Sequence, residues 1–148
     1  MDKEVLFEKI KTLKENLSEL KTSASRAKEN ISKVYTEQVK YLLTGISYLV
    51  TDIGQKVIAM NVGKVFNNVI LELPLNARDV FVKLGETRII PIEAVPNLKK
   101  LITSANKNTV DMEFVSKAIP SVEEFIFYIN SFLKGTELYK ESDEDRVI

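Results

Sequence analysis

The amino-acid sequence predicts an α+β fold, in which long helices precede a small antiparallel β-meander and short helices follow it. Three observations support this prediction. Apolar residues recur every three or four positions over the first 34 residues, apolar residues alternate within 65–93, and a helix-capping sequence opens the segment 121–134. Apolar periods near 3.5 and 2 residues are typical of helices and strands, respectively. An all-α helical bundle is the alternative if the strands in 65–93 are misassigned.

The first helix is expected from Asp2 to at least Val34, because the chain has no Pro or Gly before Gly45. Its apolar residues follow the heptad pattern of a coiled-coil helix. The weak helix formers at 22–25 could interrupt it, but the apolar period runs through them, so one continuous helix is favoured over a hairpin. The stripe forms the predicted interaction seam, whose members are Leu6, Ile10, Leu13, Leu17, Leu20, Ala24, Ala27, Ile31 and Val34.

The seam requires a covering surface, because one helix cannot bury its own apolar stripe. With Leu6 at heptad position d, a parallel dimer would place Lys9 against Lys14, and none of the three following pairs is attractive. This arrangement disfavours a parallel zipper. The alanines at the centre of the seam instead favour packing against several helices. The surface could come from the segment 39–60, from a second copy of the chain or from another protein.

The middle of the chain changes from a helical to an alternating pattern. Residues 39–60 carry a broad apolar face, which is typical of a helix packed in a core. Polar residues at 52–56 leave its apolar stretch far short of the roughly 20 residues that cross a bilayer. After Gly63, alternation predicts strands at 69–73 and 80–84, and Gly85 predicts a hairpin turn into a third strand that ends near 92.

Three short helices are expected after the meander, at 96–105, 109–119 and 121–134. The second should end before Pro120, because the residue preceding a proline disfavours helical backbone. Ser121 and Glu124 have the spacing of a capping box for the last helix, and Gly135 is placed to end it. The predicted organisation is an N-terminal helical arm at 1–61, a small α+β domain at 62–136 and a flexible acidic tail at 137–148.

The composition argues against most catalytic chemistry. The 21 basic and 21 acidic residues balance, so no overall field attracts the chain to nucleic acid or membranes. The absence of Cys and His removes disulfides, thiolate metal sites and the commonest general base. No phosphate-binding glycine loop is present. The sequence therefore predicts a protein that is not an enzyme and holds no cofactor or metal. Its charged start lacks a signal peptide, which predicts a cytoplasmic protein.

Two groups of lysines are candidate contacts for a polyanion. They are Lys14, Lys21 and Lys28 along one edge of the first helix, and Lys99, Lys100 and Lys107 around the helix at 96–105. Lysines in such arrangements can contact a phosphate backbone. Acidic residues nearby dilute the charge, so a solvated flank is the simpler interpretation.

The predicted function is therefore a non-enzymatic interaction or assembly protein, either an adaptor or a structural subunit. It would act through its N-terminal coiled-coil-like helices. Its partner would be another protein or the chain itself, as a homo-oligomer other than a parallel zipper. A regulator associated with nucleic acid through its lysine-rich faces is the alternative, although direct contact with nucleic acid is disfavoured.

Overall fold

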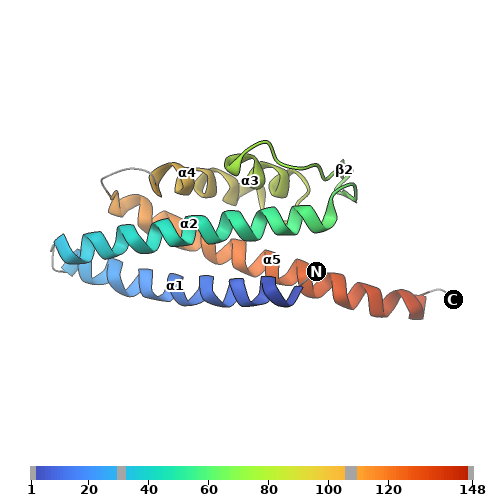
Figure 1. Ribbon diagram of the computed structural model, residues 1–148, viewed down its shortest axis with the longest axis horizontal. Coiled ribbons are helices and arrows are strands. Elements are labelled where there is room, and N and C mark those ends of the chain that lie inside the picture. Colours follow the sequence, from blue (N-terminus) through green and yellow to red (C-terminus); the bar gives the residue numbers. More distant parts are fainter. Residues whose placement is uncertain (1–2, 30–32, 106–109, 147–148) are drawn as a thin grey trace.

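The computed structural model describes residues 3–29, 33–105 and 110–146. Helices α1 (Lys3–Glu29) and α2 (Lys33–Asn61) run antiparallel and side by side (Figure 1). The long helix α5 (Met112–Arg146) packs against α1 and α4. Helix α3 (Ala77–Glu86), the 3-10 helix η1 (Ile92–Ala94) and α4 (Val95–Ala105) lie on the side of α2 opposite to α1. A hairpin of β1 (Val65–Phe66) and β2 (Val69–Ile70) joins α2 to α3. The molecule is thus mainly helical with a small antiparallel sheet, and the predicted α+β class is confirmed only in this coarse form.

The predicted seam of α1 is covered by other helices of the same chain. Its seven members from Leu6 to Ala27 are each at most 7% exposed, and α2 and α5 pack against α1. Val34 belongs to α2 and is 71% exposed, whereas Ile31 lies outside the described residues. The expectation of packing against several helices is confirmed. The expected continuous helix is wrong, because α1 ends at Glu29 and α2 begins at Lys33.

Helix α2 has the broad buried face that its sequence predicts. Gly54 lies on this face, where α2 packs against α3. A Cβ atom built there would lie 2.5 Å from Cγ1 of Val80 and 3.3 Å from Cδ1 of Leu84. The missing side chain is therefore what lets α3 pack tightly on α2. None of the described helices is long and apolar enough to cross a membrane.

The predicted three-stranded meander is wrong. Of its three strands only residues 69–70 of the first are a strand, and they pair with 65–66 in a hairpin that the alternating pattern did not predict. Val65 pairs with Ile70, and Phe66 pairs with Val69. The two turn residues, Asn67 and Asn68, have φ values of 54° and 61°, which asparagine tolerates better than most residues. One face of the hairpin is anchored to α5 by an edge-to-face contact between Phe66 and Phe132, whose ring centroids lie 5.5 Å apart.

The strand expected at 80–84, the first half of the hairpin predicted around Gly85, lies in the helix α3 instead. At its start, the Asn76 side chain accepts a hydrogen bond from the backbone N–H of Asp79 at 2.9 Å. The Asp79 carboxylate in turn accepts one from the backbone N–H of Leu75 at 2.8 Å. This reciprocal capping satisfies donors that a helix otherwise leaves open. In the sequence this capping signature is short. The prediction of a strand followed the alternating apolar residues at 80–84, although residues at this spacing also suit one face of a helix.

Gly85 serves packing inside α3 rather than a hairpin turn. A Cβ atom at this position would lie 2.6 Å from Cγ2 of Val95, so α3 and α4 meet here. The turn comes later, at Arg88, whose φ is 61°. The N–H of Arg88 donates to the carbonyl of Gly85, and that of Ile89 donates to the carbonyl of Leu84. These two bonds are those of a Schellman motif, with arginine in the position that glycine usually occupies.

The predicted break at Pro120 is also wrong, because α5 continues through both Pro120 and Gly135. Asp111 caps this helix by accepting hydrogen bonds from the backbone N–H groups of Glu113 and Phe114. The capping box predicted at Ser121 therefore does not form. The Ser121 hydroxyl instead donates to the carbonyl of Lys117, one turn earlier in the helix. It also accepts a hydrogen bond from the Asn97 amide at 3.0 Å. Ser121 thus links α5 to α4.

Candidate functional site

A pocket lies on the boundary between α1 and α5. It has a volume of about 330 Å³ and is lined by Lys14, Leu17, Ser18 and Lys21 of α1 and by Glu123, Ile126, Phe127 and Asn130 of α5. A second pocket of about 200 Å³ continues along the same boundary and shares Lys21. Its other lining residues are Ala24, Ser25, Met112, Val115, Ser116 and Ile119. We refer to the two pockets together as the α1–α5 groove.

The floor of the groove is apolar, whereas its α1 edge carries lysines. Leu17 and Ile126 are buried and give the floor an apolar surface. Lys14 and Lys21 are exposed on the α1 edge, seven residues apart and thus two helical turns along the same face. Lys21 forms an ion pair with Glu123 across the groove at 2.9 Å. Within the described ranges, no carboxylate pairs with Lys14.

The α5 edge of the groove carries an exposed aromatic side chain. Phe127 is 64% exposed although it lines the larger pocket. Its ring contacts that of Tyr128 edge-to-face, with centroids 5.3 Å apart. Aromatic residues that remain exposed beside a pocket are frequent anchors in protein interfaces. The groove therefore combines an apolar floor, an aromatic edge and a positive edge, which is a combination suited to an amphipathic ligand.

A smaller pocket lies where α2, α4 and the start of α5 meet. It has a volume of about 120 Å³ and is lined by Lys40, Leu43, Lys100, Ser104, Ala105, Val110, Asp111 and Phe114. The Lys100 ammonium lies 5.0 Å from the centre of the Phe114 ring, in a cation–π arrangement. Asp111 caps α5 with the same carboxylate that lines this pocket. These polar groups thus already have structural roles.

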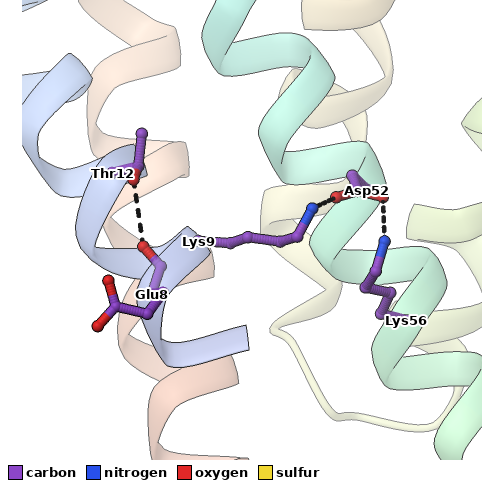
Figure 2. A network of polar contacts seen from close by, with 5 residues as sticks. All are labelled: Glu8, Lys9, Thr12, Asp52 and Lys56. Atoms are coloured by element: carbon purple, nitrogen blue, oxygen red, sulfur yellow. Dashed lines mark hydrogen bonds and ion pairs between the residues drawn. The ribbon is translucent and has the colours of Figure 1, made fainter. Parts of the chain in front are cut away.

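A charged cluster joins α1 to α2 on the other side of α1. Figure 2 shows Lys9 extending from α1 to Asp52, while Lys56 approaches the same carboxylate from one turn further along α2. Lys56 Nζ lies 2.6 Å from Oδ1 of Asp52, and Lys9 binds Oδ2. The Asp52 side chain is only 15% exposed, so two cations surround a largely buried anion.

This arrangement shifts the pKa values of Asp52 and Lys9. Burial acts to raise the pKa of Asp52, but hydrogen bonds from Lys56 and Lys9 outweigh it and lower the pKa below its ordinary value. The hydrogen bond to Asp52 raises the pKa of Lys9. Both shifts favour the charged pair, so the cluster stabilises the contact between α1 and α2 at neutral pH.

The structure separates the lysines that the sequence analysis grouped. Lys14 and Lys21 share the α1–α5 groove, and Lys100 lines the smaller pocket, whereas Lys99 lines neither. The Lys28 side chain and Lys107 lie outside the described residues. The polyanion contact stays a prediction. The described ranges contain no group of three or more His, Cys, Asp or Glu residues arranged to hold a metal ion.

Sequence reasoning missed the residues that α5 contributes to the groove. Phe127 and Asn130 come from the face of α5 that is not buried, so the apolar period of the helix did not mark them. No sequence signal marks them, because adjacent large side chains on a helix can both be buried, as Phe125 and Ile126 are. From the sequence, Asp52 is only one of the polar residues at 52–56 that shorten an apolar stretch, and its ion pairs with Lys9 and Lys56 were not predicted.

Comparisons with known proteins identify a shared fold. No family model matches the chain, and no curated protein matches it at a significant level. A solved structure of a tri-AMPylated HEPN toxin from Shewanella oneidensis in complex with an MNT antitoxin contains a chain that superposes with a TM-score of 0.68. The two chains are 20% identical, and the match covers 88% of this chain and 99% of that one.

A second structure shows the same similarity. It is the toxin–antitoxin complex MntA–HpeT carrying a tyrosine-to-alanine mutation, with a TM-score of 0.68 and 19% identity. The match covers 86% of this chain and 99% of that one. At this level of identity the similarity establishes the fold. Both neighbours are found with a protein partner.

These neighbours correct three predictions. The adaptor or structural subunit, together with the nucleic-acid regulator offered as its alternative, is wrong, because the neighbours belong to toxin–antitoxin complexes. The prediction of a protein that is not an enzyme is contradicted by the same finding, since the first of these complexes joins a HEPN toxin to an MNT antitoxin, a minimal nucleotidyltransferase. The coiled-coil description is wrong as well. The seam is packed inside a bundle, and the neighbours are not coiled-coil adaptors.

Proposed function

We propose that this chain is one member of a two-protein toxin–antitoxin pair whose other member is a nucleotidyltransferase-like protein. The observation that carries the proposal is the fold match, which spans 99% of the neighbouring chain in each of two such complexes. Nearly the whole of each neighbouring chain therefore has a counterpart in 86–88% of this one. Since one fold can host several functions, a growth experiment tests the assignment directly.

The proposal extends to the chemistry named for the first neighbour, in which the toxin carries three AMP groups. Among the tyrosines whose side chains the structure describes, the exposed ones are Tyr41, Tyr48 and Tyr128. A tyrosine oxygen would attack the α-phosphorus of ATP, forming an oxygen–phosphorus bond while pyrophosphate leaves. The phenolic proton would pass to a base of the partner. Tyr41 and Tyr48 are 79% and 69% exposed, more than Tyr128 at 42%, which makes them the preferred acceptors among these three.

The first experiment expresses this chain in a bacterial host, alone and together with the nucleotidyltransferase-like protein encoded nearest to it in its own genome. The proposal expects growth to stop when the chain is expressed alone and to recover when the partner is present. It also expects the two proteins to elute together in size-exclusion chromatography. Unchanged growth combined with separate elution would contradict it. Self-association and a cytoplasmic location stay predictions, and the molar mass of the chain alone tests the former.

A further inference from the structure

The α1–α5 groove is built to receive a ligand that is apolar on one side and acidic beside it. Its floor consists of the buried side chains Leu17 and Ile126, and Phe127 stands exposed along one edge. The opposite edge carries Lys14 and Lys21. Because Lys21 is already paired with Glu123, Lys14 supplies the uncompensated positive charge of the groove within the described part of the chain.

The dimensions of the groove suit a helix. Its α1 wall runs from Lys14 to Ser25, and eleven helical steps of about 1.5 Å give a length of about 16 Å, or three turns. In its second half, Ala24 and Ser25 form the α1 wall, while the α5 wall is apolar apart from Ser116. The short side chains of the α1 wall leave room for the backbone of a third helix. A helix that binds such a groove presents residues at i, i+3, i+4 and i+7 to its floor.

We propose that the α1–α5 groove binds an acidic amphipathic helix of the partner protein, with a carboxylate of that helix facing Lys14 and an apolar side chain packed against Phe127. This inference refines the proposed function, on which it rests for the existence of a protein partner. A nucleic acid fits the groove less well, because its phosphates would meet the carboxylate of Glu123 and leave the apolar floor uncovered.

The test uses a synthetic probe rather than the natural partner. The probe is a helical peptide with leucines along one face and glutamates flanking them, and the matched peptide has lysines in place of the glutamates. Binding to the full chain is followed by fluorescence anisotropy and by amide NMR shifts. We expect the glutamate peptide to bind and to shift resonances of α1 and α5 along the groove, and we expect the lysine peptide not to bind. Higher salt should weaken the binding, because the charges are exposed.

Two variants and a control locate the interaction. Lys14→Glu should weaken binding about tenfold or more, since it places like charges together. Phe127→Ala should weaken it by a similar factor of about ten through the lost apolar contact, without changing the fold, because the ring is mostly exposed. Lys11→Glu makes the same charge change on an exposed position of α1 that lines neither pocket, and should leave binding unchanged.

Several results would overturn the inference. These are the absence of binding, equal binding of the two peptides, and an equal effect of Lys14→Glu and Lys11→Glu. Groove resonances that shift with protein concentration alone would show that a second copy occupies the groove instead. Competition by a short RNA at the same resonances would show that it is a nucleic-acid site. None of these results affects the growth and co-elution test, so failure of the inference can be distinguished from failure of the proposed function.

Discussion

Lys21 Nζ lies 2.9 Å from Glu123 Oε2, and this ion pair joins α1 to α5 where the two pockets of the groove meet. Both side chains are about half exposed, at 49% and 48%. An ion pair that water can reach contributes little to folding. The pair therefore belongs to the lining of the groove rather than to the supports of the fold.

Replacing Glu123 with Gln should therefore change the free energy of unfolding by less than about 1 kcal/mol, because exposed pairs contribute only about 0.2–1 kcal/mol. Urea unfolding measures this change. The matched comparison is Phe125→Ala, two residues away, which removes a fully buried ring packed edge-to-face on Phe81 and should cost about 3–5 kcal/mol. A loss above about 2 kcal/mol for Glu123→Gln would show that the pair is structural.

Asp52→Asn should destabilise the chain by about 1–2 kcal/mol at neutral pH, because it leaves Lys9 and Lys56 without their shared carboxylate. Figure 2 shows that the nearby Glu8 carboxylate takes no part in the network, so Glu8→Gln is the matched control and should have a negligible effect. Equal losses for the two variants would contradict the role assigned to Asp52.

The contribution of this cluster should also depend on pH in a defined way. Since the folded pKa of Asp52 is lowered, its contribution is present above the unfolded pKa of about 3.9 and is lost as the pH falls through the folded pKa. Since the folded pKa of Lys9 is raised, its contribution is present below about 10.4 and is lost as the pH rises through the folded pKa. The stability difference between the wild type and Asp52→Asn should therefore peak between these limits. A difference that grows toward pH 3 would refute this account.

Gly54→Val should destabilise the chain by about 1–3 kcal/mol, because the added side chain would enter space that Val80 and Leu84 occupy. Gly135→Ala provides the opposite case. This glycine lies within α5 with open space around it, so alanine should stabilise the helix by up to about 1 kcal/mol. Thermal unfolding of both variants measures the contrast, and equal shifts in melting temperature would show that α2 and α3 do not approach as closely as described.

Arg88→Gly should stabilise the chain by about 0.5–1 kcal/mol, because Arg88 ends α3 with a φ of 61° that glycine adopts without strain. Arg78→Gly is the control, since this exposed arginine lies inside α3 and its replacement should destabilise the helix by about 1 kcal/mol. Chemical denaturation distinguishes the two directions. Destabilisation by Arg88→Gly would indicate that the arginine side chain makes a contact that outweighs its backbone cost.

Helices whose apolar residues follow only the helical period could be predicted from the sequence. Segments whose apolar residues fit both the helical and the strand period could not. The seam from Leu6 to Ala27 and the broad face of α2 were recognised because each fits only a helix. In α3, the spacing of Val80, Val82 and Leu84 fits a strand, whereas Val80 and Leu84 also share one face of a helix. The caps at Asn76 and Arg88 decide that this segment forms a helix. Their hydrogen bonds are local, so they leave only a weak pattern in the sequence.

The boundaries of α5 and of the groove depend on tertiary contacts that a single sequence does not reveal. Pro120 is tolerated inside α5, and the neighbouring Ser121 hydroxyl bonds to Asn97 of α4, 24 residues earlier. The groove brings Lys14 near Phe127, which lies more than a hundred residues away along the chain. The apolar period marks the faces that enter the core, so it left Phe127 and Asn130 unmarked.

The central claim is that this chain forms a pair with a nucleotidyltransferase-like protein, and intact-mass spectrometry tests it most directly. The chain is incubated with that protein and ATP and then compared with the Tyr41→Phe and Tyr48→Phe variants. The account predicts adducts of one adenylyl group each, with fewer of them on at least one variant. An unmodified mass in the presence of an active partner, as shown by its turnover of ATP, would contradict it.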